Sequence, residues 1–291
     1  MSEFLQFFLS GLAVGAVYAL VALGFTIIYN ASDVVNFAQG EFVMLGGMIT
    51  ATAFMAGWSL PFAALFAVVF TALVGIALNK FAIEPARKAP VVSIIIITIG
   101  ASIFVRGLTQ VFLGKQLYRF PAFTGEAPIH IFGATIVPQN LWVFFGAILI
   151  FVLLWLFFNK TLLGRAVLAT ANNRMAALLV GINTNYVMTL SFAVSAAIGA
   201  LAGVLVTPIT LTSFDIGMTM ALKGFAAAML GGMGNPKGAL VGGIVLGLLE
   251  SMTAGYISSQ YKDAAAFVVI LAVLFFMPQG LFGARTSAER V

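Results

Sequence analysis

The chain has 291 residues, of which 62% are hydrophobic and 8% are charged, whereas a soluble globular domain carries about 25% charged residues. This composition excludes a soluble fold. Cysteine is absent, which excludes disulfides, thiolate nucleophiles and cysteine-based metal sites. The net charge is +5, but Lys and Arg lie between apolar runs rather than in a patch with interleaved aromatic residues, so no nucleic-acid binding is expected.

Apolar runs recur along the whole chain, each near the length of about 20 residues that a helix needs to cross the hydrocarbon layer. The sequence therefore predicts an all-α, polytopic transmembrane helical bundle with about eight or nine spanning segments. The predicted segments lie at residues 5–28, 37–57, 60–81, 91–113, 139–158, 186–207, 218–232, 238–258 and 264–282. The first is expected to be retained, because no Lys or Arg precedes it and it is longer than a signal-peptide core.

Basic residues between the segments predict the orientation in the membrane. They are Lys80, Arg87 and Lys88 at the 82–90 connection, Lys160, Arg165 and Arg174 in the 159–185 connection, and Arg285 and Arg290 in the tail. With nine crossings these places share one side, and the excess of positive charge makes that side cytoplasmic. The amino terminus should then face out and the carboxyl terminus in. The 114–138 connection, although it carries Lys115 and Arg119, falls outside, where its prolines predict an ordered, non-helical loop.

The second and seventh segments are short or interrupted and rich in glycine, and both contain the pentapeptide MLGGM, at residues 44–48 and 229–233. A broken membrane helix is tolerated only where its backbone faces protein or a water-filled cavity, so both segments are candidates for lining a path. Because the two would run in opposite directions, the pentapeptides indicate either an inverted internal repeat or chance. Glycine pairs four residues apart predict close helix packing. They are Gly11/Gly15, Gly199/Gly203 and Gly243/Gly247.

Five polar residues beside or inside apolar segments are candidates for a translocation path. Asn36 and Gln39 have the spacing of a capping box, and Glu41 falls in or near the first turn of the second segment. Capping does not fully explain Glu41, because an ionisable group there risks entering the low-dielectric region. A role in a polar gate at the cytoplasmic mouth is therefore an equally supported interpretation. Glu250 lies in the eighth segment and needs a partner or water, and Lys223 is the nearest candidate counter-charge. A structural ion pair and a pathway pair both remain open.

Enzymatic chemistry is not expected of the chain. His130 is the only histidine, so neither a two-histidine metal site nor a Ser-His pair can be built. No G-x-x-x-x-G-K-[ST] loop is present, so any ATP would have to be bound by another polypeptide. The stretch GNPKGA at residues 234–239 predicts a turn between the seventh and eighth segments.

The 159–185 connection is too polar to span a membrane and too apolar for a flexible linker. Its leucines recur at near-helical spacing, which predicts a short amphipathic helix that ends at Gly181. Such a helix either lies on the membrane surface or docks on a cytosolic partner.

Four stretches of the sequence together resemble a known family. GFTIIYNASDVVNFAQGEFVMLGG, GRAVLATANNRMAALLVGINTNYV, GFAAAMLGGMGNPKGALVGGIVLGLLES and FMPQGLFG resemble the membrane-spanning permeases of bacterial branched-chain amino acid ABC importers. The likeness is strongest to the shorter membrane subunit of the high-affinity type for Leu, Ile and Val. It implies that residues 1–291 form a single permease domain in the bacterial inner membrane, surrounded by membrane lipid.

The resemblance also implies partners. These are a second related permease, two cytosolic ATPase subunits that bind the ATP, and an extracytoplasmic substrate-binding protein, with no cofactor in this chain itself. Matching positions place the segment that couples to the ATPase at Gly164, Arg165, Arg174 and Gly181.

Two residues depart from the family pattern. Gln39 stands where members usually have His, and Asn172 lies near a position where they usually have an acidic residue. If those groups titrate or form a salt bridge to the ATPase in relatives, this chain must use neutral hydrogen bonds instead. Permeases of this type also move urea, short amides and other amino acids, which leaves the substrate open. A self-sufficient channel or secondary transporter is the rival hypothesis, and an intramembrane enzyme has the least support.

Overall fold

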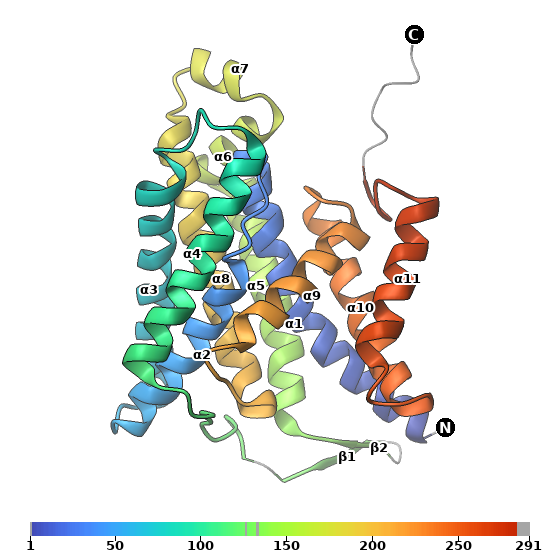
Figure 1. Ribbon diagram of the computed structural model, residues 1–291. Helices are drawn as coiled ribbons and strands as arrows, with labels where there is room; N and C mark the ends of the chain where they lie inside the picture. The colour runs from blue at the N-terminus through green and yellow to red at the C-terminus, as the bar shows by residue number, and fades with distance from the viewer. Residues whose placement is uncertain (1, 126, 132–133, 284–291) are drawn as a thin grey trace.

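A computed structural model describes residues 2–125, 127–131 and 134–283 and confirms the all-α bundle (Figure 1). The helices are α1 (Ser2–Ser32), α2 (Gln39–Met55), α3 (Leu60–Leu78), α4 (Val91–Leu113), α5 (Pro138–Lys160), α6 (Leu162–Asn172), α7 (Arg174–Leu179), α8 (Thr184–Thr210), α9 (Ile216–Gly231), α10 (Pro236–Tyr256) and α11 (Lys262–Phe276). A π-helical turn (Asn79–Ile83) extends α3, and β1 (Ile129–Ile131) pairs with β2 (Ala134–Ile136) as an antiparallel hairpin.

Each predicted apolar segment corresponds to one helix, which confirms a polytopic membrane protein. Among the described residues, six helices are long and apolar enough to cross a bilayer: α1, α3 with its π-helical turn, α4, α5, α8 and α10. The helices α2, α9 and α11 are apolar but shorter, with 17, 16 and 15 residues. The last helix ends at Phe276, earlier than predicted, because Pro278 cannot continue a helix.

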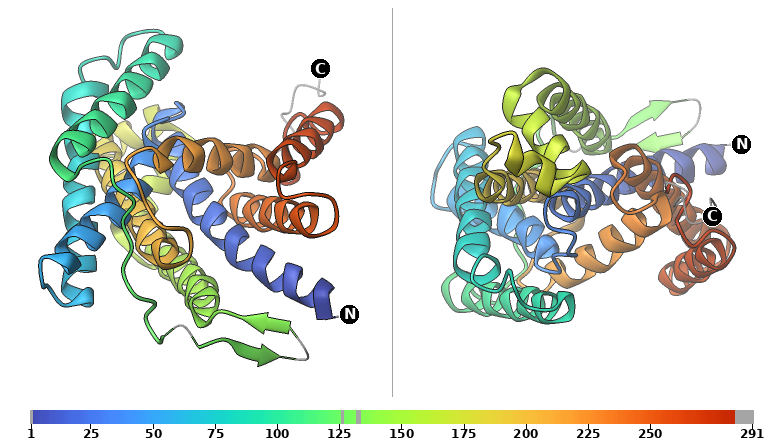
Figure 2. Two further views of the ribbon diagram at one scale, coloured as in Figure 1. Left: turned by 60° about the horizontal axis from the view of Figure 1, so that its bottom comes forward. Right: turned by 90° about the horizontal axis from the view of Figure 1, so that it is seen from above.

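The first helix lies at the centre of the bundle. Every residue from 15 to 28 is buried, and α1 packs most extensively against α10 and α8. Seen from one end, α3 and α4 form one flank and α10 and α11 the other, with α9 between them (Figure 2). Because α3, α4 and α5 leave much apolar surface exposed, they are suited to face lipid.

The predicted glycine pairs are packing sites. A Cβ atom on Gly247 would lie 2.2 Å from the backbone nitrogen of Gly15, so α1 and α10 touch backbone to backbone. A Cβ on Gly203 would lie 2.0 Å from the carbonyl oxygen of Val43, so α8 contacts α2 in the same way. The described helices therefore use small residues to bring distant parts of the chain into direct contact.

The connections group at the two ends of the bundle as the charges predicted. The helices α6 and α7 and the α3–α4 connection lie at one end, and the β-hairpin and the start of α1 lie at the other (Figure 1). In the 114–138 connection, Tyr118 exchanges two backbone hydrogen bonds with Thr212, of 2.8 and 3.0 Å. Arg285 and Arg290 lie outside the described residues.

The two MLGGM stretches occupy different local structures. Residues 44–48 lie inside α2, where Gly46 packs against the backbone of Ala200. Residues 229–233 instead close α9, and Gly232 leaves the helix with φ of 102°. The shared pentapeptide therefore gives an inverted repeat no support. The predicted turn that follows is confirmed, since the Asn235 side chain accepts hydrogen bonds from the first turn of α10.

Candidate functional site

The predicted capping box before α2 is wrong. The helix begins at Gln39, and its N-cap residue is Ala38, which has no capping side chain. The Asn36 side chain instead accepts a hydrogen bond of 3.1 Å from the Ala38 backbone within the preceding turn. The spacing was right but the helix begins too late in the chain for Asn36 to cap it. Glu41 does lie in the first turn of α2.

Gln39 joins three helices inside the protein. Its amide nitrogen donates to the Ser195 carbonyl oxygen at 3.3 Å. The Ser195 hydroxyl lies 2.7 Å from the Gln39 amide oxygen and 2.8 Å from the Gly24 carbonyl, either of which can accept its proton. Gln39 is fully buried, so a neutral hydrogen-bond network links α1, α2 and α8 at this position.

Glu41 is a buried carboxylate, 1% exposed, between α2, α4 and α9. The Ser102 hydroxyl donates to its Oε1 at 2.7 Å, and its Oε2 has no hydrogen-bond partner. A Cβ on Gly217 would lie 2.3 Å from Oε2, so only glycine lets the carboxylate approach the first turn of α9. The positive end of that helix dipole stabilises a negative charge there.

Arg106 supplies a cation near Glu41 that the sequence reading missed. It lies within the membrane-spanning helix α4, one turn after Ser102, whose hydroxyl contacts Glu41. Among the described residues, the acceptor in reach of its guanidinium is the Met218 sulfur of α9, at 3.8 Å. Arg106 is the one charged residue in the apolar run 91–113, and that isolation was the signal that could have revealed it.

The predicted pairing of Lys223 with Glu250 is confirmed, and it belongs to a larger network. The Lys223 Nζ lies 2.9 Å from Glu250 Oε1 and 2.8 Å from Asp263 Oδ1. It also donates to the Tyr18 hydroxyl at 3.0 Å, while that hydroxyl donates to Glu250 Oε2 at 2.7 Å. These four side chains connect α1, α9, α10 and α11.

The predicted amphipathic helix of the 159–185 connection is two helices rather than one. Asn173 is extended, with φ of −157° and ψ of 102°, and its side chain accepts a hydrogen bond from the Ala176 backbone. It therefore ends α6 and caps α7. The predicted stop is confirmed, since Gly181 has φ of 84°. Gly181 and Ile182 donate back to the carbonyls of the last turn, as in a Schellman motif.

The coupling residues inferred from the resemblance have different surroundings. A Cβ on Gly164 would lie 2.1 Å from the Phe157 carbonyl, so this glycine permits the sharp passage from α5 to α6. Arg165, Arg174 and Gly181 are exposed at the end of the bundle. In the neighbouring α3–α4 connection, burial is the main cause that lowers the pKa of Arg87. Repulsion from Arg174 lowers this pKa further, whereas the charge of Glu84 raises it.

Four apolar side chains project from the same end and define the α7 surface. Its members are Met175, Leu178, Leu179 and Val180, and Leu179 is 86% exposed. Such a surface is suited to contact either a partner protein or the membrane surface.

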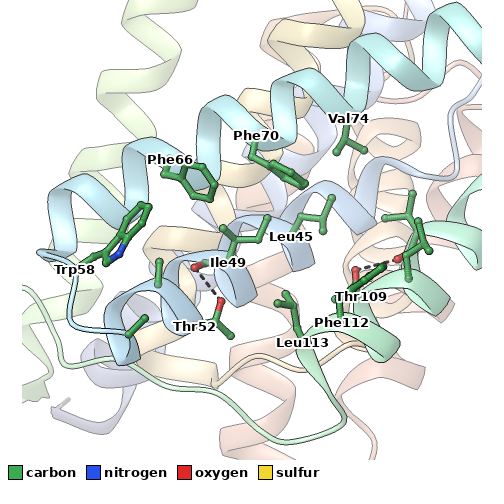
Figure 3. A pocket seen from close by; sticks show the side chains of 14 residues that line it. Leu45, Ile49, Thr52, Trp58, Phe66, Phe70, Val74, Thr109, Phe112 and Leu113 are labelled. Carbon is green, nitrogen blue, oxygen red and sulfur yellow. Dashed lines mark hydrogen bonds between the residues drawn. The ribbon is translucent and has the colours of Figure 1, made fainter.

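An apolar groove of about 590 Å³ lies between α2, α3 and α4 (Figure 3). It is lined by Leu45, Ile49, Thr52, Ala53, Ala56, Trp58, Phe66, Phe70, Val74, Val105, Leu108, Thr109, Phe112 and Leu113. The hydroxyls of Thr52 and Thr109 donate to carbonyls of their own helices, at 2.8 and 2.9 Å. The groove therefore offers an almost purely apolar surface.

Residues 7–277 match the family described as branched-chain amino acid transport system, permease component. The chain belongs to this permease family. This permease is 34% identical over 302 aligned residues to the high-affinity branched-chain amino acid transport system permease protein LivH of Escherichia coli, with 99% of this chain and 98% of the relative covered. The corresponding protein BraD of Pseudomonas aeruginosa is 33% identical, with the same coverage.

The fold of the permease also occurs in a solved structure, PsaBC from Streptococcus pneumoniae in complex with Fab. The TM-score is 0.51 at 14% sequence identity, and the match covers 96% of this chain and 94% of that chain. At this identity the likeness concerns the fold alone.

Proposed function

We propose that the permease is the membrane-spanning subunit of an ATP-driven importer for branched-chain amino acids. The observation that carries this proposal is the 34% identity, over nearly the whole chain, to a permease protein named for high-affinity branched-chain amino acid transport. The sequence contains no P-loop, which supports a division of labour in which separate subunits bind the ATP.

The proposed assembly contains two cytosolic ATPase subunits, an extracytoplasmic binding protein and a second related permease. The chain itself, a single domain over residues 1–291, carries no cofactor. The end that holds α6 and α7 faces the cytoplasm of a bacterial cell, and the start of α1 faces out. Arg87, Lys160, Arg165 and Arg174 support this orientation, because they gather at the α6–α7 end.

The α7 surface is the proposed dock for an ATPase subunit. Its apolar side chains extend into solvent at the end of the bundle, and Asn173 and Gly181 fix where α7 begins and ends. Closure of the ATPase subunits would be transmitted through α6 and α7 to the helices that surround α2 and α9.

The test is leucine uptake by the purified complex in proteoliposomes that contain ATP. We expect uptake to require ATP, the ATPase subunits and the binding protein. Uptake without an ATPase, at a rate that follows an ion gradient, would instead indicate a secondary transporter or channel. Uptake of urea or short amides in place of leucine would correct the substrate.

The coupling assignment has a separate test. Leu179→Glu places a charge on the α7 surface, and we expect loss of co-purified ATPase subunits and of substrate-stimulated ATP hydrolysis. Leu117→Glu is the matched control, because Leu117 is 69% exposed in the connection at the opposite end, and it should retain the ATPase subunits. If Leu179→Glu, or replacement of Arg174 and Gly181, left coupled uptake intact, α7 would not be the dock.

A further inference from the structure

We propose that Glu41, Ser102 and Arg106, at one end of the apolar groove, form a binding site for a zwitterionic amino acid with an apolar side chain. The site would hold the substrate briefly within the membrane. This inference rests on the proposed function, and it names where in this chain the transported molecule is held.

Glu41 and Ser102 lie one helical turn from residues that line the groove. Leu45 follows Glu41 by one turn of α2, and Val105 follows Ser102 by about one turn of α4. The hydrogen bond between Ser102 and Glu41 fixes these turns side by side. Since Leu45 and Val105 both line the groove, its apolar wall begins one helical turn from the carboxylate.

Glu41 and Arg106 are an acidic and a basic side chain on neighbouring helices, and they are not paired. Among the described residues no ion pair joins them, Glu41 Oε2 lacks a partner, and Arg106 contacts the weak acceptor Met218. A charge within the membrane is costly unless it meets a partner or water. The network of Lys223 and Glu250 is different, because there the two charges meet directly at 2.9 Å.

An amino acid zwitterion supplies both missing partners. Its ammonium group can donate to the Glu41 carboxylate, and its own carboxylate can accept the forked hydrogen bonds of the Arg106 guanidinium. Ser102 orients the Glu41 carboxylate and the first turn of α9 stabilises its charge. The apolar side chain would lie against Leu45 and beyond, where the groove's own hydroxyls are already satisfied.

Lipid is the competing occupant, since the groove lies between helices with much exposed apolar surface. The absence of cysteine allows a direct test in the complete complex in proteoliposomes. Thr109→Cys places a thiol in the groove, and Val111→Cys, at a position 78% exposed on the same helix and outside the groove lining, is the control. The probe is a charged, membrane-impermeant methanethiosulfonate, with labelling of this chain read by mass spectrometry.

We expect the thiol at position 109 to react and the thiol at position 111 to remain unlabelled. Leucine, supplied with binding protein and ATP, should slow the reaction at position 109 by about tenfold. A thiol at position 109 that is unreactive while uptake proceeds would show a lipid-filled groove and overturn the inference. Labelling that leucine does not slow would overturn it as well.

Substitution of the charged residues gives a second readout. The binding protein delivers the substrate, so Arg106→Gln should lower the maximal uptake rate by about tenfold or more, with KM changed far less. Arg106→Lys, which keeps the charge, should recover part of the rate. Unchanged maximal uptake in Arg106→Gln would refute the site. If the unmodified complex imports no amino acid, the proposed function fails on its own, independently of these comparisons.

Discussion

Replacing Lys223 with Met is expected to destabilise the permease strongly. Lys223 and Glu250 are both buried, and the Lys223 ammonium contacts Glu250, Asp263 and Tyr18. Removing the cation leaves the Glu250 carboxylate with the Tyr18 hydroxyl as its hydrogen-bond partner. Loss of one member of a buried ion pair costs about 3–5 kcal/mol, because the other charge remains uncompensated.

The same network provides the control. The Asp263 side chain is 52% exposed, so Asp263→Asn removes an ion pair that solvent already screens and should cost about 0–1 kcal/mol. The double variant Lys223→Met/Glu250→Gln should recover much of the stability lost in Lys223→Met, since no unpaired charge is left at position 250.

The assay is equilibrium denaturation of the purified complex in a mild detergent. It gives the free energy of unfolding for the unmodified protein, the two single variants and the double variant. The reasoning fails if Lys223→Met is no more destabilising than Asp263→Asn. It fails equally if the double variant is less stable than Lys223→Met alone.

Two further predictions concern packing and capping. Gly247→Leu should cost about 3 kcal/mol or more and reduce the amount of folded protein in the membrane, because its side chain would meet the backbone of Gly15. Gly100→Ala, with nothing within 4 Å, should change stability by less than about 1 kcal/mol. Asn173→Ala removes the cap of α7 and should cost that helix about 1 kcal/mol. Hydrogen exchange should then be faster in α7, whereas Asn172→Ala leaves it unchanged, and equal exchange in both variants would contradict the capping role.

The helices and one ion pair could be predicted because each depends on a strong local or topological signal. Apolar runs set the positions of the helices, and an ionisable residue inside such a run demands a partner. Lys223 and Glu250 were therefore paired from the sequence. Tyr18 and Asp263 were not, since neither an aromatic residue within a helix nor an acid at a helix start stands out without the fold.

The remaining features depend on where helices begin and on which helices touch. Asn36 and Gln39 have capping spacing, but the helix starts only at Gln39. Apolar periodicity continues across Asn173, so it concealed the boundary between α6 and α7. The hydrogen bond of Glu41 to Ser102 links residues 61 positions apart, and no spacing rule relates positions on separate helices.

The packing of α1 against α10 has a consequence for how the protein is made. Tyr18 and its acceptor Glu250 are separated by 232 residues, which a ribosome adds in about 10–50 s at ordinary elongation rates. Until α10 is made, the glycine face of α1 and the Tyr18 hydroxyl lack the contacts that Gly247 and Glu250 provide. The early helices are therefore inserted into the membrane before α1 can pack against α10. A nascent chain released before residue 236 lacks α10, the helix that completes the packing around α1.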